Sequence, residues 1–246
     1  MRGFGEVAER LRRSTARVFT RGSGGGSGIV WSADGLILTN AHVARDAAAE
    51  VELWDSRRRP AAVVARDPRR DLATLRIAAD GLEPAIPGDS TSLRPGELVL
   101  AIGSPFGFAG ALSSGVVHSV GERWILAAVR LAPGNSGGAL AGADGRVVGI
   151  NTAVVNGMGA AVPMAAALDF LARGPRPSLG VTLAPAPSGL IILDVAPGSR
   201  AEAASLRPGD VLLCTVDELH RALDAPGPLR VRFLRGGRRR LFETAA

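Results

Sequence analysis

LAPGNSGGAL, at residues 131–140, places Ser136 between Gly134-Asn135 and Gly137-Gly138. A serine hydroxyl becomes a useful nucleophile only where it is exposed, next to a base and close to donors for the oxyanion that it creates. Glycines on both sides allow a sharp turn and bring backbone N–H groups near a reacting carbonyl. A surface turn has the same composition, because Gly, Asn and Ser are common in turns. The stretch therefore makes Ser136 a candidate nucleophile whose assignment depends on a base elsewhere in the chain.

The chain has three histidines, and His42 is the best candidate for that base. His42 follows an apolar run, in the sequence Thr-Asn-Ala-His-Val. His118 lies in an alternating strand pattern that favours a half-exposed structural position, and His220 lies in a short helical pattern that favours a solvated one. Asp71 opens the apolar segment 71–77. A carboxylate beside an imidazole fixes its tautomer and stabilises the imidazolium, so Asp71 is the candidate orienting acid.

Three segments, in the order His–Asp–Ser, together resemble the HtrA (DegP-like) trypsin-fold serine proteases. They are TNAHV at 39–43, DLATLRI at 71–77 and LAPGNSGGAL at 131–140. The resemblance implies a mainly β fold, with a two-barrel trypsin-like serine protease domain followed by a small, shortened PDZ-like α+β domain. It implies a protease domain at 1–173, a linker at 174–177 and a PDZ-like domain at 178–246.

The resemblance also assigns roles to residues. Ser136 attacks the scissile carbonyl, His42 is the base, and Asp71 orients His42. The turn Gly134-Asn135-Ser136 forms the oxyanion hole, with the N–H groups of Gly134 and Ser136 as donors. The substrate backbone pairs by β-augmentation with an edge strand, one face of which also belongs to the core; its residues are Ile150, Asn151, Thr152 and Ala153. No metal or cofactor is required, because the triad supplies both base and nucleophile.

Hairpin signals support a β fold and exclude a nucleotide-binding loop. The glycine-rich segment 22–28 would have to open a helix to bind phosphate. It is followed instead by two strand-like runs, 29–31 and 36–39, joined by the turn Asp34-Gly35. Further strands are predicted at 17–21, 50–54, 61–65 and 72–77 for a first barrel, and at 98–103, 115–120, 124–129 and 146–151 for a second. A helix is predicted at 164–173.

Composition argues against a nucleic-acid partner despite a formal charge of +6 and a pI near 11.2. Every basic residue is arginine, the arginine clusters are scattered, and aromatic residues make up only 4% of the chain. Solvated arginines are therefore favoured over a nucleic-acid surface. A single cysteine, Cys214, excludes an internal disulfide.

The first twenty residues contain no apolar segment of the kind that a signal peptide needs. Phe4, Val7 and Leu11 fall instead at helical spacing, and the resemblance places homotrimer contacts in this segment. The uncharged run 147–168 is interrupted by Asn, Gly and Pro, so no membrane span is predicted. The sequence alone favours the cytoplasm, whereas the family is commonly extracytoplasmic, and the compartment stays open.

The C-terminal segment resembles a PDZ domain at Ser178–Val181 and in the later Leu-Arg-Pro-Gly-Asp-Val-Leu run. The N–H groups of Leu179, Gly180 and Val181 are expected to form a nest for the carboxylate of a peptide C-terminus. The short connection Cys214-Thr215 before the predicted helix 216–223 departs from the family pattern. Two functions follow from the sequence: a serine endopeptidase acting on unfolded or damaged proteins, and a non-catalytic PDZ peptide-binding protein on an idle protease fold. The intact triad favours the first.

Overall fold

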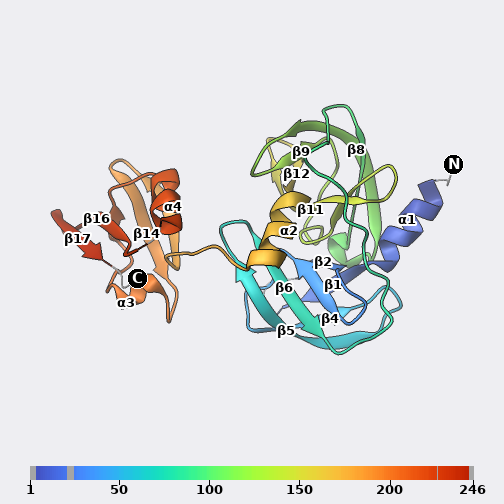
Figure 1. Cartoon of the computed structure of the whole chain (residues 1–246), viewed down its shortest axis with the longest axis horizontal. Helices are drawn as coiled ribbons and strands as arrows, with labels where there is room; N and C mark the ends of the chain where they lie inside the picture. The colour runs from blue at the N-terminus through green and yellow to red at the C-terminus, as the bar shows by residue number, and fades with distance from the viewer. Residues whose placement is uncertain (1–3, 21–24, 226, 244–246) are drawn as a thin grey trace. The chain divides into compact units, whose positions relative to one another are not determined.

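The computed structural model describes residues 4–20, 25–225 and 227–243, and it divides the chain into two units (Figure 1). The first unit ends at Pro175 and the second begins at Arg176. The expected linker 174–177 thus contains the division between the units. Within the described residues no helix is both long enough and apolar enough to cross a membrane.

The first unit begins with one helix and continues as two closed antiparallel barrels. The first barrel has six strands, in the spatial order β1 (Thr15–Phe19), β2 (Gly26–Val30), β3 (Leu36–Thr39), β6 (Leu72–Ile77), β5 (Arg58–Asp67) and β4 (Ala48–Glu52). The turn Asp34-Gly35 joins β2 to β3, and Gly35 has a φ of 96° that suits glycine alone. Of the predicted strand 17–21, Arg21 lies outside the described residues.

The second barrel repeats this arrangement with the same order of strands. They run β7 (Leu98–Gly103), β8 (Ala111–Val120), β9 (Ile125–Ala127), β12 (Met158–Pro163), β11 (Val147–Val155) and β10 (Ala139–Gly142). A single turn of 3₁₀ helix, η1 (Pro105–Gly107), follows β7. The two barrels confirm the predicted trypsin-like architecture.

A shared apolar core joins the two barrels and two helices. It contains Leu38 and Leu72 of the first barrel and Ile102 and Ile150 of the second, all fully buried. Each such side chain contributes about 1.5–3 kcal/mol when it is removed from water. Helix α2 (Met164–Arg173) packs Phe170 into the same core. The barrels are therefore packed as one body, and the space between their ends is fixed.

The N-terminal helix α1 (Phe4–Arg13) forms at the predicted helical spacing and buries Val7 and Leu11 in this core. Its apolar side is thus used within the unit, while Phe4 is 57% exposed. The homotrimer contact expected for this segment stays a prediction.

The second unit is a five-stranded sheet with two helices. The sheet order is β13 (Val181–Ala186), β14 (Gly189–Val195), β15 (Val211–Leu212), β16 (Arg230–Arg235) and β17 (Arg238–Glu243), so β13 lies at an edge. The helices are α3 (Arg200–Ala203) and α4 (Val216–Asp224). Leu219 and Leu223 of α4 pack with Leu179 in the core of this unit.

The short connection before α4 is stabilised by a capping box. The hydroxyl of Thr215 accepts the N–H of Glu218 at 3.2 Å, and the Glu218 carboxylate accepts the N–H of Thr215 at 2.8 Å. Both donors would otherwise be unsatisfied at a helix start. The backbone N–H of Thr215 also holds the pKa of Glu218 below its ordinary value. The chain therefore enters α4 directly from β15 without the additional strand expected from the family.

Asp210 anchors the sheet of the second unit. Its carboxylate accepts two hydrogen bonds from the Arg235 guanidinium, at 2.7 and 2.6 Å, and one from the N–H of Arg207. Burial by itself would raise the pKa of Asp210, but the bonds from Arg235 and Arg207 outweigh it and the pKa is lowered. The ionised carboxylate is thus the form that fits this position.

Candidate active site

His42 and Asp71 lie together because the strands that carry them are neighbours. His42 lies in the turn after β3, Asp71 directly precedes β6, and the antiparallel pairing sets Thr39 opposite Ala73. The end of one strand therefore lies beside the start of the other. Nδ1 of His42 is 2.7 Å from Oδ2 of Asp71, and the backbone N–H of His42 donates to Oδ1 at 3.0 Å. This contact fixes the imidazole with Nε2 directed away from the carboxylate.

The backbone of Asp71 is held in a left-handed conformation, with a φ of 56°. Aspartate tolerates this region better than most residues do. The side chain of Asn40, which is fully buried, donates to the carbonyl of Asp71 at 2.8 Å. Asn40 is a positioning residue that the sequence prediction missed, and its signal was an asparagine at the end of a buried strand.

A third donor to the Asp71 carboxylate comes from the second barrel. The hydroxyl of Thr152, on β11, donates to Oδ2 of Asp71 at 2.5 Å. Hydrogen bonds to an ionised carboxylate stabilise the charged form. The acid of the first barrel is thus oriented partly by a residue predicted only as a substrate contact.

Ser136 lies in a tight turn that leads into β10. Gly134 and Gly137 have φ values of 104° and 86°, which require glycine. A Cβ on Gly137 would lie 2.0 Å from the carbonyl oxygen of Ser27, so the turn packs directly against β2 of the first barrel. The N–H of Ser27 donates to the carbonyl of Ser136 at 2.7 Å and holds the nucleophile to that strand.

Asn151 supports this turn through hydrogen bonds, and its side chain is too buried to contact a substrate. It is fully buried, and its amide donates to the carbonyl of Ala139 at 2.8 Å. Its backbone pairs with the turn in both directions, accepting from Gly137 and donating to Gly138, each at 2.8 Å. Ile150 is fully buried as well and pairs with strands on both sides. The structure therefore corrects the substrate-binding assignment of Ile150 and Asn151, because neither belongs to an open edge.

The open part of β11 begins at Thr152. From Ala153 to Val155 the strand pairs with β12, whereas β10 pairs only as far as Ile150. A pocket of about 220 Å³ lies beside this open edge and the nucleophile. It is lined by residues 131–133, Asn135, Ser136 and residues 152–154. We call this cavity the acyl pocket.

Two backbone N–H groups near Ser136 are available to an oxyanion. The carbonyl of Pro133 accepts the N–H of Phe106 at 3.0 Å. Since the peptide bond is trans, the N–H of Gly134 points the opposite way. Among the hydrogen bonds of the described residues, none uses the N–H of Gly134 or of Ser136. The N–H of Asn135 donates to Ala132 at 3.0 Å, so Asn135 is not a backbone donor of this hole.

The hydroxyl of Ser136 donates to the carbonyl of Thr152 at 3.0 Å. Within the described part of the chain, no hydrogen bond joins it to His42. Transfer of its proton to His42 therefore requires rotation of the hydroxyl away from Thr152. Catalytic hydrogen bonds of this kind often close only when substrate is bound.

The other candidate residues lie elsewhere. His118 is exposed on β8, and His220 belongs to α4 in the second unit. Leu179 is buried, and a Cβ on Gly180 would lie 2.3 Å from the Cβ of Ser199. Among described hydrogen bonds none uses the N–H of Leu179 or Gly180, and Val181 opens the edge strand β13.

Comparison with known proteins agrees with this geometry. Residues 26–150 match the model of the trypsin-like peptidase domain. A probable periplasmic serine endoprotease (DegP-like) from Marinomonas sp. (strain MWYL1) is 38% identical over 221 residues, 76% of this chain and 47% of that protein. The mitochondrial serine protease HTRA2 of Bos taurus is 35% identical over 263 residues, 86% of this chain and 57% of that protein. The chain spans about half the length of the curated relatives that it matches.

Solved structures extend the likeness over the whole chain. The serine endoprotease from Yersinia pestis has a TM-score of 0.70 and 26% identity, covering 100% of this chain and 97% of that chain. The HtrA-type protease AlgW with decapeptide has a TM-score of 0.66 and 27% identity, covering 99% and 98%.

We predict that Thr152→Val slows the reaction of Ser136 with a fluorophosphonate by about tenfold, because Asp71 loses one hydrogen bond to its charged form. Thr152→Ser keeps the hydroxyl and is the matched control, which should react like the parent chain. The rate is measured by mass spectrometry of the labelled protein, with thermal unfolding recorded alongside. Equal rates for the valine and serine variants would contradict a role for this hydroxyl.

Proposed function

The chain belongs to the HtrA (DegP-like) family of trypsin-like serine peptidases, and we propose that it is an endopeptidase that hydrolyses peptide bonds in unfolded or damaged proteins. The observation that carries the proposal is the His42–Asp71 pair, joined at 2.7 Å, beside a serine turn with two unused N–H donors. A peptide-binding protein without catalysis would need neither. The alternative of an idle protease fold is therefore not favoured.

In the proposed mechanism, His42 Nε2 takes the hydroxyl proton of Ser136 as its oxygen attacks the scissile carbonyl. The C=O π bond becomes an oxyanion held by the N–H groups of Gly134 and Ser136. Collapse of the intermediate breaks the C–N bond, and His42 returns the proton to the leaving amine. Water then attacks the acyl-enzyme by the same route, so the base is regenerated.

Substrate binding and activation of Ser136 are coupled through one acceptor. The carbonyl of Thr152, which accepts the Ser136 hydroxyl, lies on the open edge of β11. A substrate strand added to this edge donates its own N–H to that carbonyl. The displaced hydroxyl is then free to rotate to His42.

Single substitutions test the triad. Ser136→Ala and His42→Ala should each abolish casein hydrolysis without unfolding the chain. Asp71→Asn should lower kcat by about 10⁴-fold, the loss measured in a related triad when the acid is replaced by its amide. Asparagine also tolerates the left-handed backbone of this position, so folding should be kept. Activity of Asp71→Asn near that of the parent would mean that another carboxylate orients His42.

We also propose that cleavage follows small aliphatic residues. The acyl pocket is lined mainly by 131–133 and 152–154. An adjoining cavity of about 440 Å³ shares Leu131, Ala132, Asn135 and Val154 with it. Neither cavity is lined by an acidic residue. A buried lysine or arginine would therefore have no counter-charge.

Peptides that differ only in the residue before the cut test this specificity. Valine or alanine should be favoured over arginine by about a hundredfold in kcat/KM, the cost of burying an unpaired charge. Products of casein digestion should show the same order by mass spectrometry. Cuts mostly after arginine or lysine would overturn the assignment of the pocket.

For the second unit we propose capture of peptide C-termini, as in a PDZ domain. The edge strand β13 leaves room for an added strand, and the unused N–H groups of Leu179 and Gly180 suit a carboxylate. The likeness to HtrA-type structures covers 99% of the chain and includes this unit. Such a unit would tether a long substrate near the active site and raise its effective concentration.

Truncation after Arg173 tests the tether. Hydrolysis of a short peptide should stay within about twofold of the parent chain, while degradation of casein should fall by about tenfold or more, because only the long chain reaches both units. The two assays use the same truncated protein and the same concentration of reactive Ser136, titrated with a phosphonate. Equal loss in both assays would assign the second unit a purely structural role, and equal retention would show that it captures no substrate.

A further inference from the structure

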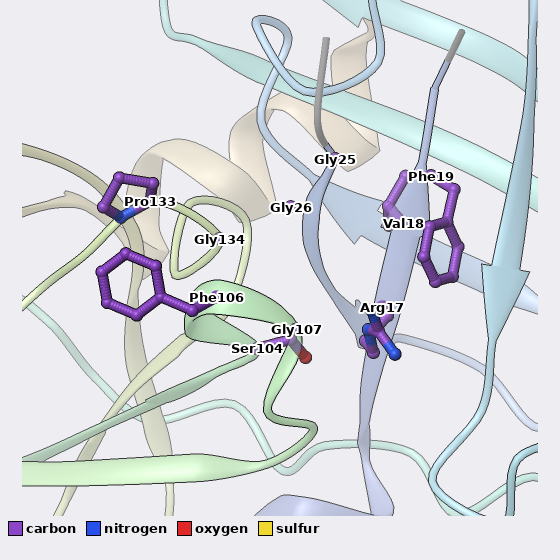
Figure 2. A pocket seen from close by; sticks show the side chains of 10 residues that line it. All are labelled: Arg17, Val18, Phe19, Gly25, Gly26, Ser104, Phe106, Gly107, Pro133 and Gly134. Carbon is purple, nitrogen blue, oxygen red and sulfur yellow. The ribbon is translucent and has the colours of Figure 1, made fainter. Parts of the chain in front are cut away.

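A third pocket, of about 380 Å³, lies beside the turn that carries Ser136 (Figure 2). Its walls come from β1, the start of β2, the η1 turn and Pro133-Gly134. Figure 2 shows Phe106 and Pro133 on one side of this pocket and Arg17 and Phe19 on the other. We call it the leaving-group pocket, because we infer that it receives the substrate residues after the scissile bond.

The acyl pocket and the leaving-group pocket share Pro133; Ser136 and Thr152 line only the acyl pocket, and Gly134 lines only the leaving-group pocket. Gly26 brings the leaving-group pocket against the nucleophile, since a Cβ there would lie 2.8 Å from the carbonyl oxygen of Ser136. The same Cβ would lie 2.7 Å from Val43, the neighbour of His42. A substrate whose residues before the cut pair with β11 therefore continues past Gly134 into this pocket.

Arg17 is the one charged residue that lines the described wall of this pocket. Its side chain is 25% exposed, and its guanidinium lies 4.6 Å from the ring centre of Phe19, which fixes its position. Nη1 donates to Glu52 at 3.1 Å. Nη2 is directed to Gly107, 3.2 Å from where a Cβ on that glycine would lie, and makes no hydrogen bond with a described residue.

Glu52 pairs with Arg17 without lining the cavity, and its second oxygen accepts Nε of Arg58 at 2.7 Å. Arg58 also donates to Glu50 at 3.2 Å, and Glu50 does not line the cavity either. Arg17 is thus the charged group of this cluster that faces the pocket. An arginine fork with one side paired keeps N–H donors for a second carboxylate.

We propose, on the basis of the peptidase function above, that Arg17 selects a carboxylate at the first or second residue after the scissile bond. The group is an aspartate or glutamate side chain, or the terminal carboxylate of a substrate that ends there. Both offer the same planar oxygen pair to the guanidinium. The apolar acyl pocket would then select the residue before the scissile bond, and the cationic leaving-group pocket would select a residue after it.

Paired quenched peptides test the proposal. All carry the same residues up to a valine at the cut, and the members of a pair carry Glu or Gln at the second position after it. A further pair ends at that position as a free carboxylate or as an amide. The parent chain should favour the carboxylate member by about tenfold in kcat/KM, the size of one charge-assisted hydrogen bond.

Variants assign the preference to its residue. Arg17→Met should reduce the ratio to near one, and Arg17→Lys should keep part of it. Arg76→Met is the matched control, because Arg76 is an arginine of the same unit that lines none of the three cavities described and should keep the full ratio. A ratio near one in the parent chain, or a full ratio in Arg17→Met, would overturn the proposal. A preference confined to the free-carboxylate pair would identify the chain end as the ligand.

Binding separates this inference from the peptidase function. Calorimetric titration of the same peptides into Ser136→Ala and Ser136→Ala/Arg17→Met measures the preference without turnover. The carboxylate peptide should bind about tenfold more tightly to the first variant and equally with its partner peptide to the second. A parent chain that cleaves none of the peptides would contradict the proposed peptidase, while equal binding of each pair to Ser136→Ala would contradict the role of Arg17.

Discussion

The hydrogen bond from the N–H of Ser27 to the carbonyl of Ser136, at 2.7 Å, joins the two barrels at the proposed nucleophile. The hydroxyl of Ser27 adds a bond to the carbonyl of Gly134 at 2.7 Å and accepts the N–H of Ser104 at 2.8 Å. Ser27 is fully buried, so an unpaired hydroxyl there would be costly. One serine of the first barrel thus holds both Ser136, the proposed nucleophile, and Gly134, the proposed oxyanion donor, in place.

Strand β11 serves both structure and substrate because its pairing changes along its length. A β-bulge interrupts its pairing with β12 between Asn151 and Ala153. Bulges redirect side chains next to active sites. Here two consecutive residues contact different partners: Asn151 holds the nucleophile turn, and Thr152 orients Asp71 through its hydroxyl. Beyond the bulge the strand has an open edge, which is why we place the proposed substrate pairing from Thr152 onward.

Sequence predicted the elements that are short, apolar and bounded by turn residues. Strands β3, β6 and β7 and helix α2 have the predicted limits. The three candidate catalytic residues were predictable because each lies in a local motif. Ser27 and Asn40 were not, because a common polar residue becomes a support only through burial beside a distant segment. Asn151 was assigned to substrate because its burial depends on the pairing of β10, which no local pattern records.

Helix α2, the last helix of the first unit, also supports Asp71. Arg70, the residue before Asp71, has a side chain that is only 9% exposed. It pairs with Asp67, which is fully buried, and with Asp169 of α2. Asp67 also accepts the N–H groups of Arg69 and Arg70, at 3.0 and 3.1 Å, which holds the loop as a turn. Removing one partner of a buried ion pair leaves an uncompensated charge, so this loop resists rearrangement. Because Asp71 follows Arg70 in a left-handed conformation, a shift of the loop would turn its carboxylate away from His42. Helix α2 therefore belongs to the catalytic unit for an electrostatic reason as well as through the burial of Phe170.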